Sequence, residues 1–331
     1  MPAESLERHQ TQKRASCGVC GNEAGNRIFT AREMMFGLGD SFEYRECSSC
    51  GCLQIADVPA DLTRYYPREY YSFGRLQKPN LLKRFLKKRR AAHLFGSPTL
   101  LGGVLIRLVG PPPFSRWSKK PYLAPGDAVL DVGCGSGKLL MEMHLGGFQN
   151  LTGIDPYIER DVAYAPGLAV MRRTLDQMEG TFDVVMLHHV LEHSSDPRAM
   201  LREVHRVLRP GGHALIRTPV AGSHAWRTYQ ADWVQLDPPR HISIQTEKSL
   251  RLLAEQAGFS VEEVLYDSTS FQFWGSEQVR SDIPLQDRRS FERGEATSLF
   301  SRAQMRAFER KAEELNESHD GDQACFYLRK V

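Results

Sequence analysis

Four cysteines near the N-terminus stand in two pairs, and two residues separate the members of each pair. The pairs are Cys17 with Cys20 and Cys47 with Cys50, and glycines lie beside both of them. Zn²⁺ binds four thiolates in a tetrahedron, and a CxxC turn presents two thiolates to one ion. The spacing therefore predicts a structural zinc site with these four ligands; the alternative is a group of free cysteines. The remaining cysteines are expected in the core or in loops: Cys52, Cys134 and Cys325.

A glycine-rich turn in the middle of the chain has the pattern of a nucleotide-binding site. It runs from Asp131 to Gly137 with the sequence DVGCGSG, after a short apolar stretch and before a predicted helix. Glycines allow a tight turn and a close approach of the backbone to a ligand. Asp155 ends the next apolar stretch, where a carboxylate accepts hydrogen bonds from both ribose hydroxyls. The GxGxG spacing and the acidic residue directly before the glycines favour a methyl donor over a dinucleotide.

Short apolar stretches alternate with helical patterns after Pro125, which is typical of a doubly wound α/β domain. The predicted strands are 128–132, 151–154, 182–187, 214–217, 261–266 and 324–328, and the predicted helices are 199–208 and 247–257. Ligands bind at the carboxyl ends of the strands in such sheets. A segment at about 270–322, with a helix near 299–315, is expected to be an insertion over the active site.

Several motifs in this region resemble those of the class I S-adenosylmethionine-dependent methyltransferases. They are VLDVGCGSGKLL, TGIDP, FDVVMLHHVLEH, VLRPGGHALIRTP and ACFYLRK, in the order of the family. The resemblance implies a seven-stranded Rossmann-like sheet with an antiparallel final strand, S-adenosylmethionine as cofactor and methyltransferase activity. It also implies a set of donor-binding residues: Asp131, Gly133, Cys134, Gly135, Gly137, Asp155 and His188. The alternatives are a domain that binds no donor and a donor-binding scaffold that acts through its zinc module.

Histidines and a glutamate follow the predicted strand 182–187. His189, Glu192 and His193 form an HxxEH string, which in zinc peptidases lies within a long helix. Here the string follows a strand, so a peptidase site is excluded. Two interpretations stay open. Either a divalent cation is bound by these three residues, or His188 contacts the donor while Glu192 and His193 hold the following helix and loop.

His241 lies in the loop after strand 214–217, which faces the substrate in doubly wound enzymes. A histidine there can accept a proton from a hydroxyl during methyl transfer, because its pKa lies near neutral pH. We assign His241 and His189 as the candidate catalytic residues. The alternative is a structural histidine, since in-line alignment of the reactants can supply much of the rate.

The combination of zinc module and catalytic domain resembles a bacterial group of sugar and natural-product methyltransferases, as do YYPREYYSF and DPPRHISIQTEKSLRLLAEQAGF. In related deoxysugar C-methyltransferases a Glu-His pair near the second stretch supplies a base. Here the pair is Arg240 and His241, which leaves His241 as the base. The resemblance implies a small sugar-like or natural-product acceptor, methylated at a hydroxyl or a carbon. The alternative is an RNA methyltransferase that uses the zinc module to bind nucleic acid.

The 331 residues are divided here into four parts. They are a polar tail (1–16), a zinc-ribbon-like module (17–60), an aromatic and basic helical linker (61–115) and the methyltransferase domain (116–331). The net charge of +3 is too small to indicate nucleic-acid binding by itself. The basic stretch 83–90 either binds phosphates, lipids or nucleic acid, or forms a solvated helix face. The apolar stretch 99–110 is too short to span a bilayer. The CxxC pairs and the charged N-terminus predict a reducing, cytoplasmic location.

Overall fold

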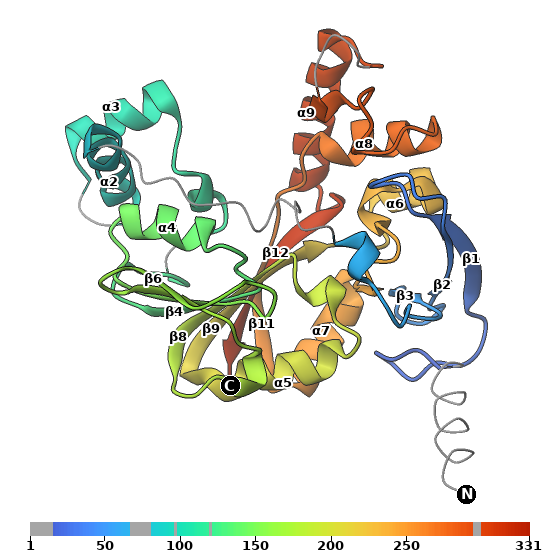
Figure 1. The fold of residues 1–331 in the computed structure, drawn as a ribbon, viewed down its shortest axis with the longest axis horizontal. Coiled ribbons are helices and arrows are strands. Elements are labelled where there is room, and N and C mark those ends of the chain that lie inside the picture. The colour runs from blue at the N-terminus through green and yellow to red at the C-terminus, as the bar shows by residue number, and fades with distance from the viewer. Residues whose placement is uncertain (1–15, 67–80, 96–97, 119–120, 294–298) are drawn as a thin grey trace, which may run out of the picture.

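The structure is a computed structural model, and it describes residues 16–66, 81–95, 98–118, 121–293 and 299–331. Most of the predicted polar tail lies outside these residues, as does the aromatic stretch from Pro67 to Phe73. The described residues form two sheets, one of eight strands and one of four (Figure 1).

The larger sheet has mostly parallel strands. They are β4 (Ala128–Val132), β5 (Asn150–Ile154), β6 (Val162–Ala165), β7 (Leu168–Met171), β8 (Phe182–His188), β9 (Leu208–Pro219), β11 (Phe259–Tyr266) and β12 (Gln323–Lys330). The strand order is β11-β12-β9-β8-β4-β5-β7-β6. Strand β12 runs antiparallel to both of its neighbours, which confirms the expected antiparallel final strand.

The sequence patterns indicated six of these strands and the resemblance implied seven, whereas the larger sheet has an eighth in β6, an edge strand antiparallel to β7. The β6–β7 hairpin was not predicted because its strands are short and rich in alanine. Strand β9 begins at Leu208 instead of near Ala214, because Leu208 already pairs with Phe182 of β8. Residues 209–212, which directly follow the predicted helix 199–208, are therefore part of a strand, and Gly211 adopts a φ of 69° there.

Helices cover both faces of this sheet because successive strand residues point to opposite sides. On one face, α2 (Leu81–Phe95) and α4 (Lys138–Leu145) pack over a core that includes Val129 and Met186. On the other face, α5 (Pro197–Val207) and α7 (Glu247–Gln256) pack over Leu130 and Val185. The side chains of Asp196 and Thr246 cap the N-termini of α5 and α7. This arrangement confirms the doubly wound α/β architecture.

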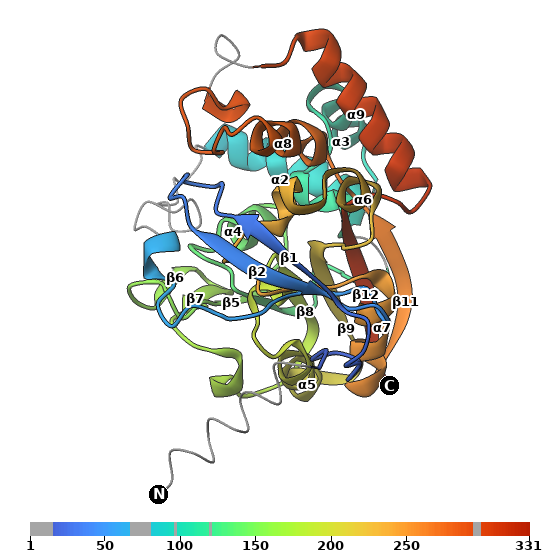
Figure 2. The same cartoon turned by 90° about the vertical axis from the view of Figure 1, so that its right-hand side faces the viewer.

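The four-stranded sheet joins two distant parts of the chain. Its strands are β1 (Arg27–Arg32), β2 (Ser41–Glu46), β3 (Leu53–Ile55) and β10 (Ser243–Ile244), paired in that order. The first three belong to the predicted zinc module, whereas β10 follows the substrate-facing loop of the catalytic domain. Figure 2 shows β1 and β2 in front of the larger sheet. The N-terminal module is thus completed by a strand of the catalytic domain.

The remaining helices are α3 (Leu100–Val109), α6 (His224–Tyr229), α8 (Phe271–Arg280) and α9 (Arg302–Glu317). Single 3-10 turns connect the elements: η1 (Thr63–Tyr65), η3 (Pro113–Arg116), η4 (Leu175–Gln177), η5 (Leu191–His193), η6 (Gln230–Asp232), η7 (Val234–Leu236) and η8 (Phe291–Arg293). Helices α8 and α9 lie between β11 and β12, in the segment predicted as an insertion, and they stand above the sheet in Figure 1.

Candidate active site

The glycine turn lies between β4 and α4 and is held against the end of β5. The backbone N–H of Gly133 donates to the carbonyl oxygen of Ile154 at 2.8 Å. Gly133, Gly135 and Gly137 all have positive φ angles, of 67°, 53° and 78°. A Cβ atom on Gly133 would lie 2.6 Å from a methyl carbon of Val190. The turn therefore requires glycine for its conformation and for its close packing.

Asp155 is positioned by the backbone of the same turn. Its carboxylate accepts hydrogen bonds from the N–H groups of Gly135 and Tyr157, each at 2.9 Å. Each carboxylate oxygen has a second lone pair for a ligand hydroxyl. Asp131 is also buried, and burial together with the charge of Asp155 raises the pKa of Asp131 to about 8. An ammonium group beside Asp131 would favour its charged form.

His188 ends strand β8 beneath an aromatic ring. The Trp117 ring lies over it, with 4.1 Å between the ring centroids. Burial lowers the pKa of His188 well below its usual range, so the ring is neutral. Its Nε2 atom is buried and has no hydrogen-bond partner among the described residues. A buried polar atom without a partner at the end of a central strand fits a position where a ligand is bound.

His189 lies in a chain of polar contacts. Its Nδ1 donates to the Glu192 carboxylate at 3.1 Å, and its Nε2 accepts from the Arg217 guanidinium at 2.9 Å. Arg217 in turn donates to Asp267 at 2.6 Å. Both ring nitrogens of His189 are thus engaged within the protein.

His193 and His241 face each other, with 4.9 Å between their ring centroids. The Nδ1 of His193 donates to the carbonyl oxygen of Arg240 at 2.8 Å, and the Nδ1 of His241 donates to that of Gln235 at 2.7 Å. A carbonyl only accepts, so the lone pair of each neutral ring resides on Nε2. Burial lowers the pKa of His241 to about 4. His241 is therefore neutral at physiological pH.

Glu192, His193 and His241 each place one ligand atom within 4.8 Å of the others. Burial alone would raise the pKa of Glu192, but the hydrogen bond from His189 and the nearby histidines lower it to about 2. The group therefore contains one carboxylate and two imidazoles. It shares Glu192 and His193 with the cation site considered from the sequence, but His241 takes the place of His189.

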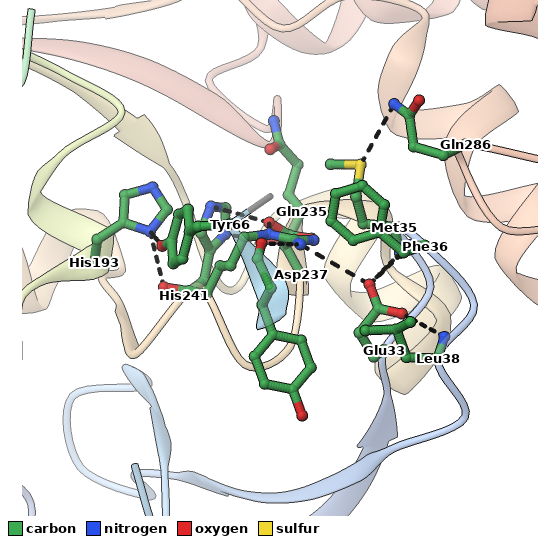
Figure 3. A network of polar contacts seen from close by, with 12 residues as sticks. Glu33, Met35, Phe36, Leu38, Tyr66, His193, Gln235, Asp237, His241 and Gln286 are labelled. Carbon is green, nitrogen blue, oxygen red and sulfur yellow. Dashed lines mark hydrogen bonds and ion pairs between the residues drawn. The ribbon is translucent and has the colours of Figure 1, made fainter. Parts of the chain in front are cut away.

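Arg240 is completely buried and is paired with Asp237, whose carboxylate also lies 3.8 Å from Nε2 of His241. Its guanidinium donates to both oxygens of Asp237 and to the carbonyl oxygen of Tyr65, and it lies 3.9 Å from Glu33. Glu33 also accepts three backbone N–H groups of the 33–40 loop. Figure 3 shows this network, with Glu33 on one side and His193 and His241 on the other. The N-terminal module thus fixes the loop that carries His241.

Tyr44 provides a second link between the module and this loop. Its hydroxyl donates to the carbonyl oxygen of His241 at 2.8 Å. The Tyr66 hydroxyl lies 3.2 Å from Nδ1 of His193, at the edge of the same site.

A cavity of about 540 Å³ opens beside this region. Asp267, at the end of the polar chain from His189, contributes to its wall. The other wall residues come from η3, the end of β11, the following loop and α9: Arg116, Leu265, Tyr266, Ser268, Thr269, Ser270, Glu309, Ala312, Glu313 and Asn316. The wall is rich in hydroxyl and charged groups, which suits a polar acceptor.

The four paired cysteines come together as predicted from their spacing. The Sγ atoms of Cys17 and Cys50 are 3.7 Å apart, and those of Cys20 and Cys47 are 3.5 Å apart. A tetrahedral zinc ion with bonds of about 2.3 Å requires sulfur separations of about 3.8 Å. A fifth thiol, on Cys52, lies 3.3 Å from Cys17, a position that the spacing did not indicate.

Side chains of the catalytic domain hold this cysteine cluster in place. Arg198 of α5 donates to the carbonyl oxygen of Val19 at 2.7 Å. Thr246, at the start of α7, donates to that of Cys50 at 2.6 Å. The cysteines also pack into the core that α5 and α7 form against the larger sheet.

Sequence patterns did not indicate several of the residues that shape the site: Glu33, Tyr44, Trp117, Arg217, Asp237 and Asp267. Most of their partners in the site lie far away in sequence, so no local spacing indicates those contacts. Asp237 had the strongest available signal, because it stands four residues before His241 in a proline-rich loop.

The turn provides a test of stability. Gly137→Ala is expected to destabilise the protein by about 2–4 kcal/mol, because the new Cβ adds overpacking to a strained positive φ. That Cβ would lie 2.6 Å from a methyl carbon of Val170. Gly180→Ala is the control, since Gly180 has a φ of 91° with no described atom within 4 Å of a built Cβ. Urea unfolding should show a loss of only about 1–2 kcal/mol for the control. Equal losses would contradict the steric effect.

The strand order and the glycine turn define a doubly wound nucleotide-binding domain. Residues 107–264 match the model of the family described as Methyltransferase domain. This part of the chain is therefore a methyltransferase domain, as its motifs predicted.

Individual relatives match about a third of the chain. A ubiquinone biosynthesis O-methyltransferase of Pseudomonas aeruginosa is 39% identical over 115 residues, which cover 31% of this chain and 49% of the relative. An EEF1A lysine methyltransferase 4 of Mus musculus is 35% identical over 129 residues, 32% of this chain and 50% of the relative. The matches thus span about half the length of these relatives. The solved structure of the mycolic acid cyclopropane synthase CmaA1 has a TM-score of 0.41 at 18% identity, over 75% of this chain and 99% of that one.

Proposed function

We propose that this protein is an S-adenosylmethionine-dependent methyltransferase that acts on a hydroxyl or a carbon of a small sugar-like or natural-product acceptor. The observation that carries the proposal is the glycine turn with Asp155 at one end of the sheet, beside the His193–His241 pair. When bound there, S-adenosylmethionine supplies an electrophilic methyl group. Asp155 would hold the ribose hydroxyls, and Asp131 would hold the ammonium group.

In this proposal His241 accepts the proton that the acceptor releases. Its Nδ1–H is committed to Gln235, so the basic lone pair on Nε2 is directed by the protein. Tyr44 and the Arg240–Asp237 pair hold the loop on which it lies. His189, with both ring nitrogens engaged, has a positioning role through Glu192. Much of the rate comes from alignment of the acceptor with the methyl group.

His241→Asn is expected to lower kcat by about 10²–10⁴-fold, because a positioned general base contributes by that factor. Donor binding, measured by calorimetry, should stay unchanged. The wild-type rate should fall only as the pH drops toward about 4, where the buried imidazole becomes protonated. The control is His205→Asn, which alters a histidine on α5 away from the site. An unchanged rate in His241→Asn would remove the base from the mechanism.

A divalent cation bound by Glu192, His193 and His241 is the alternative to a proton-accepting His241. Oxygen and imidazole ligands suit such ions. In that case activity lost on dialysis against a chelator would return only when Mg²⁺ or Mn²⁺ is added together with the Zn²⁺ that refills the cysteine cluster. Retained activity after dialysis, with donor binding intact, would favour the base.

We also propose that the cysteine cluster binds a structural zinc ion. All four sulfurs are protein ligands, so a tetrahedral ion would have no open position for substrate. The cluster holds the N-terminal module against α5 and α7.

The proposed activity is tested by incubating the protein with methyl-labelled S-adenosylmethionine and an extract of host cells. Label in a small, ribonuclease-resistant product supports the proposed acceptor class and provides the acceptor for identification. Label in ribonuclease-sensitive material would favour an RNA acceptor instead, and no transfer to any fraction would contradict the proposal.

A further inference from the structure

Helices α2 and α3 combine a strong positive charge with exposed apolar side chains. Residues 81–109 contain seven lysines and arginines and no aspartate or glutamate. Figure 1 shows the two helices at one end of the molecule, on the side opposite β1 and β2. None of the site residues described above lies on either helix.

The packing of the pair shows that it is a formed structure of the protein. Ala91 and Phe95 of α2 are buried, and Phe95 stacks on Phe114 beneath the helix. Lys87 donates to Glu142 of α4. Helix α3 packs closely on α2, since a Cβ on Gly102 would lie 2.8 Å from the carbonyl oxygen of Arg89. The glycine face of α3 is therefore turned toward α2.

The opposite face of α3 is apolar and exposed. Leu100, Val104 and Leu108 lie four residues apart on one stripe, with exposed fractions of 94%, 54% and 76%. Leu101 and Val109 extend this stripe, and Leu82 and Phe85 of α2 are also exposed. Contiguous exposed apolar surface on a folded protein is typical of an interaction site. Exposed cations lie on the same two helices: Lys83, Arg84, Lys88 and Arg89 on α2 and Arg107 on α3.

The pair does not have the geometry of a membrane span. Among the described residues no single helix is long and apolar enough to cross a bilayer, although 82–95 and 100–109 together meet the length and composition. They bend by 107° at the break. Helix α3 alone has a length of about 15 Å against a hydrocarbon core of about 30 Å. The geometry suits a helix that lies in the bilayer surface.

We propose that the α2–α3 pair docks this protein on an anionic membrane surface. The stripe of Leu100, Val104 and Leu108 enters the boundary of the acyl chains, and the cations of the two helices contact acidic headgroups. A bilayer satisfies both features at once: it offers apolar volume for the stripe and negative charge for a segment that has no acidic side chain. Nucleic acid would use the cations but leave the leucines in water.

The docked surface lies close in sequence to the catalytic region. Directly after α3, Arg116 lines the cavity and Trp117 covers His188. The membrane proposal nevertheless stands apart from the proposed methyl transfer, because vesicle binding can be measured without the donor.

The test is flotation of the full chain with vesicles of about one-third phosphatidylglycerol in phosphatidylcholine. We expect binding that weakens as salt rises from about 0.05 to 0.5 M, and little binding to phosphatidylcholine alone. The triple variant Leu100→Ser, Val104→Ser, Leu108→Ser should bind at least tenfold more weakly. The double variant Lys83→Glu, Arg84→Glu should also lose binding at low salt. All changes are at exposed positions, and circular dichroism checks that each variant is folded.

Matched controls distinguish the effect of the exposed residues of α2 and α3 from the effect of changing any exposed apolar or charged residue. Val58→Ser alters an exposed apolar residue of the N-terminal module, and Arg306→Glu with Arg310→Glu reverses two exposed charges on α9. Both controls should bind vesicles as the parent does. The proposal is overturned if the parent fails to float, or if the triple variant floats equally well. Sedimentation showing a dimer that the triple variant abolishes would assign the stripe to a second copy and also overturn it. Binding of RNA that depends on the cations but not the leucines would do the same.

Discussion

Asp155→Ala is expected to weaken binding of S-adenosylmethionine more than tenfold, a loss of about 1.4 kcal/mol or more. The alanine removes the acceptor for the ribose hydroxyls and leaves the N–H groups of Gly135 and Tyr157 without their partner. Unpaired buried donors add to the loss. Calorimetric titration measures the effect. Asp176→Ala, at an acidic residue in η4, is the control and should bind as the parent does.

A second ligand separates direct contact from distortion of the turn. S-adenosylhomocysteine and its 2′-deoxyribose analogue should differ in affinity for the parent protein, because the analogue lacks one partner of Asp155. In Asp155→Ala this difference should vanish, since a double-mutant cycle isolates the pairwise contact. A difference that persists in the variant would show that another group binds the ribose.

Removal of the metal is expected to have the largest effect on stability. The purified protein should contain one zinc ion per chain, and Cys20→Ser or Cys47→Ser should lose it. Each variant should be destabilised by several kcal/mol, because a metal bound only by the folded state contributes its binding free energy to folding. The effect should extend beyond the module, since the cysteines share a core with α5 and α7. Metal analysis and urea unfolding measure both quantities.

Cys52→Ser is the matched control for the ligand set. Its thiol is 3.4 Å from that of Cys50, yet the four sulfurs that all lie within 4.8 Å of one another are those of the two CxxC pairs. This variant should keep the zinc ion. The opposite result, in which Cys52→Ser loses the zinc ion and Cys20→Ser retains it, would show that Cys52 and not Cys20 is a ligand.

The parts of the fold that could be predicted are those specified by local patterns. Strands β4, β5 and β8 are continuous apolar runs that end at glycine, aspartate or histidine, and the capped helix α7 follows a clear helical period. The glycine turn and Asp155 were predicted for the same reason. Their chemistry lies within one β-turn-α unit and the strand after it.

The parts that could not be predicted depend on distant partners. Strand β10 has only two residues, and it is a strand only because β3 lies beside it. His241 could be singled out by its type, but the roles of Glu33, Tyr44 and Asp237 around its loop are set by tertiary contacts. Arg240 stands where the related C-methyltransferases have the glutamate of a Glu-His pair, and this difference has a physical reason that spacing could not show. Its side chain forms a buried ion pair with Asp237 and joins the N-terminal module, whereas only its backbone contacts His193.

The pairing of β3 with β10 also bears on how the chain is made. Gln54 and Ser243 are partners about 190 residues apart, so the small sheet cannot close until most of the chain has left the ribosome. The two CxxC turns emerge early, and each needs only its own neighbours to present its thiolates. A zinc ion bound at that stage would protect the reactive thiolates. It would also keep β2 and β3 close together until α5, α7 and β10 have been synthesised and can pack against them. The metal would then first protect the cysteines of the nascent chain. In the folded protein it would stabilise the contact between the N-terminal module and the catalytic domain.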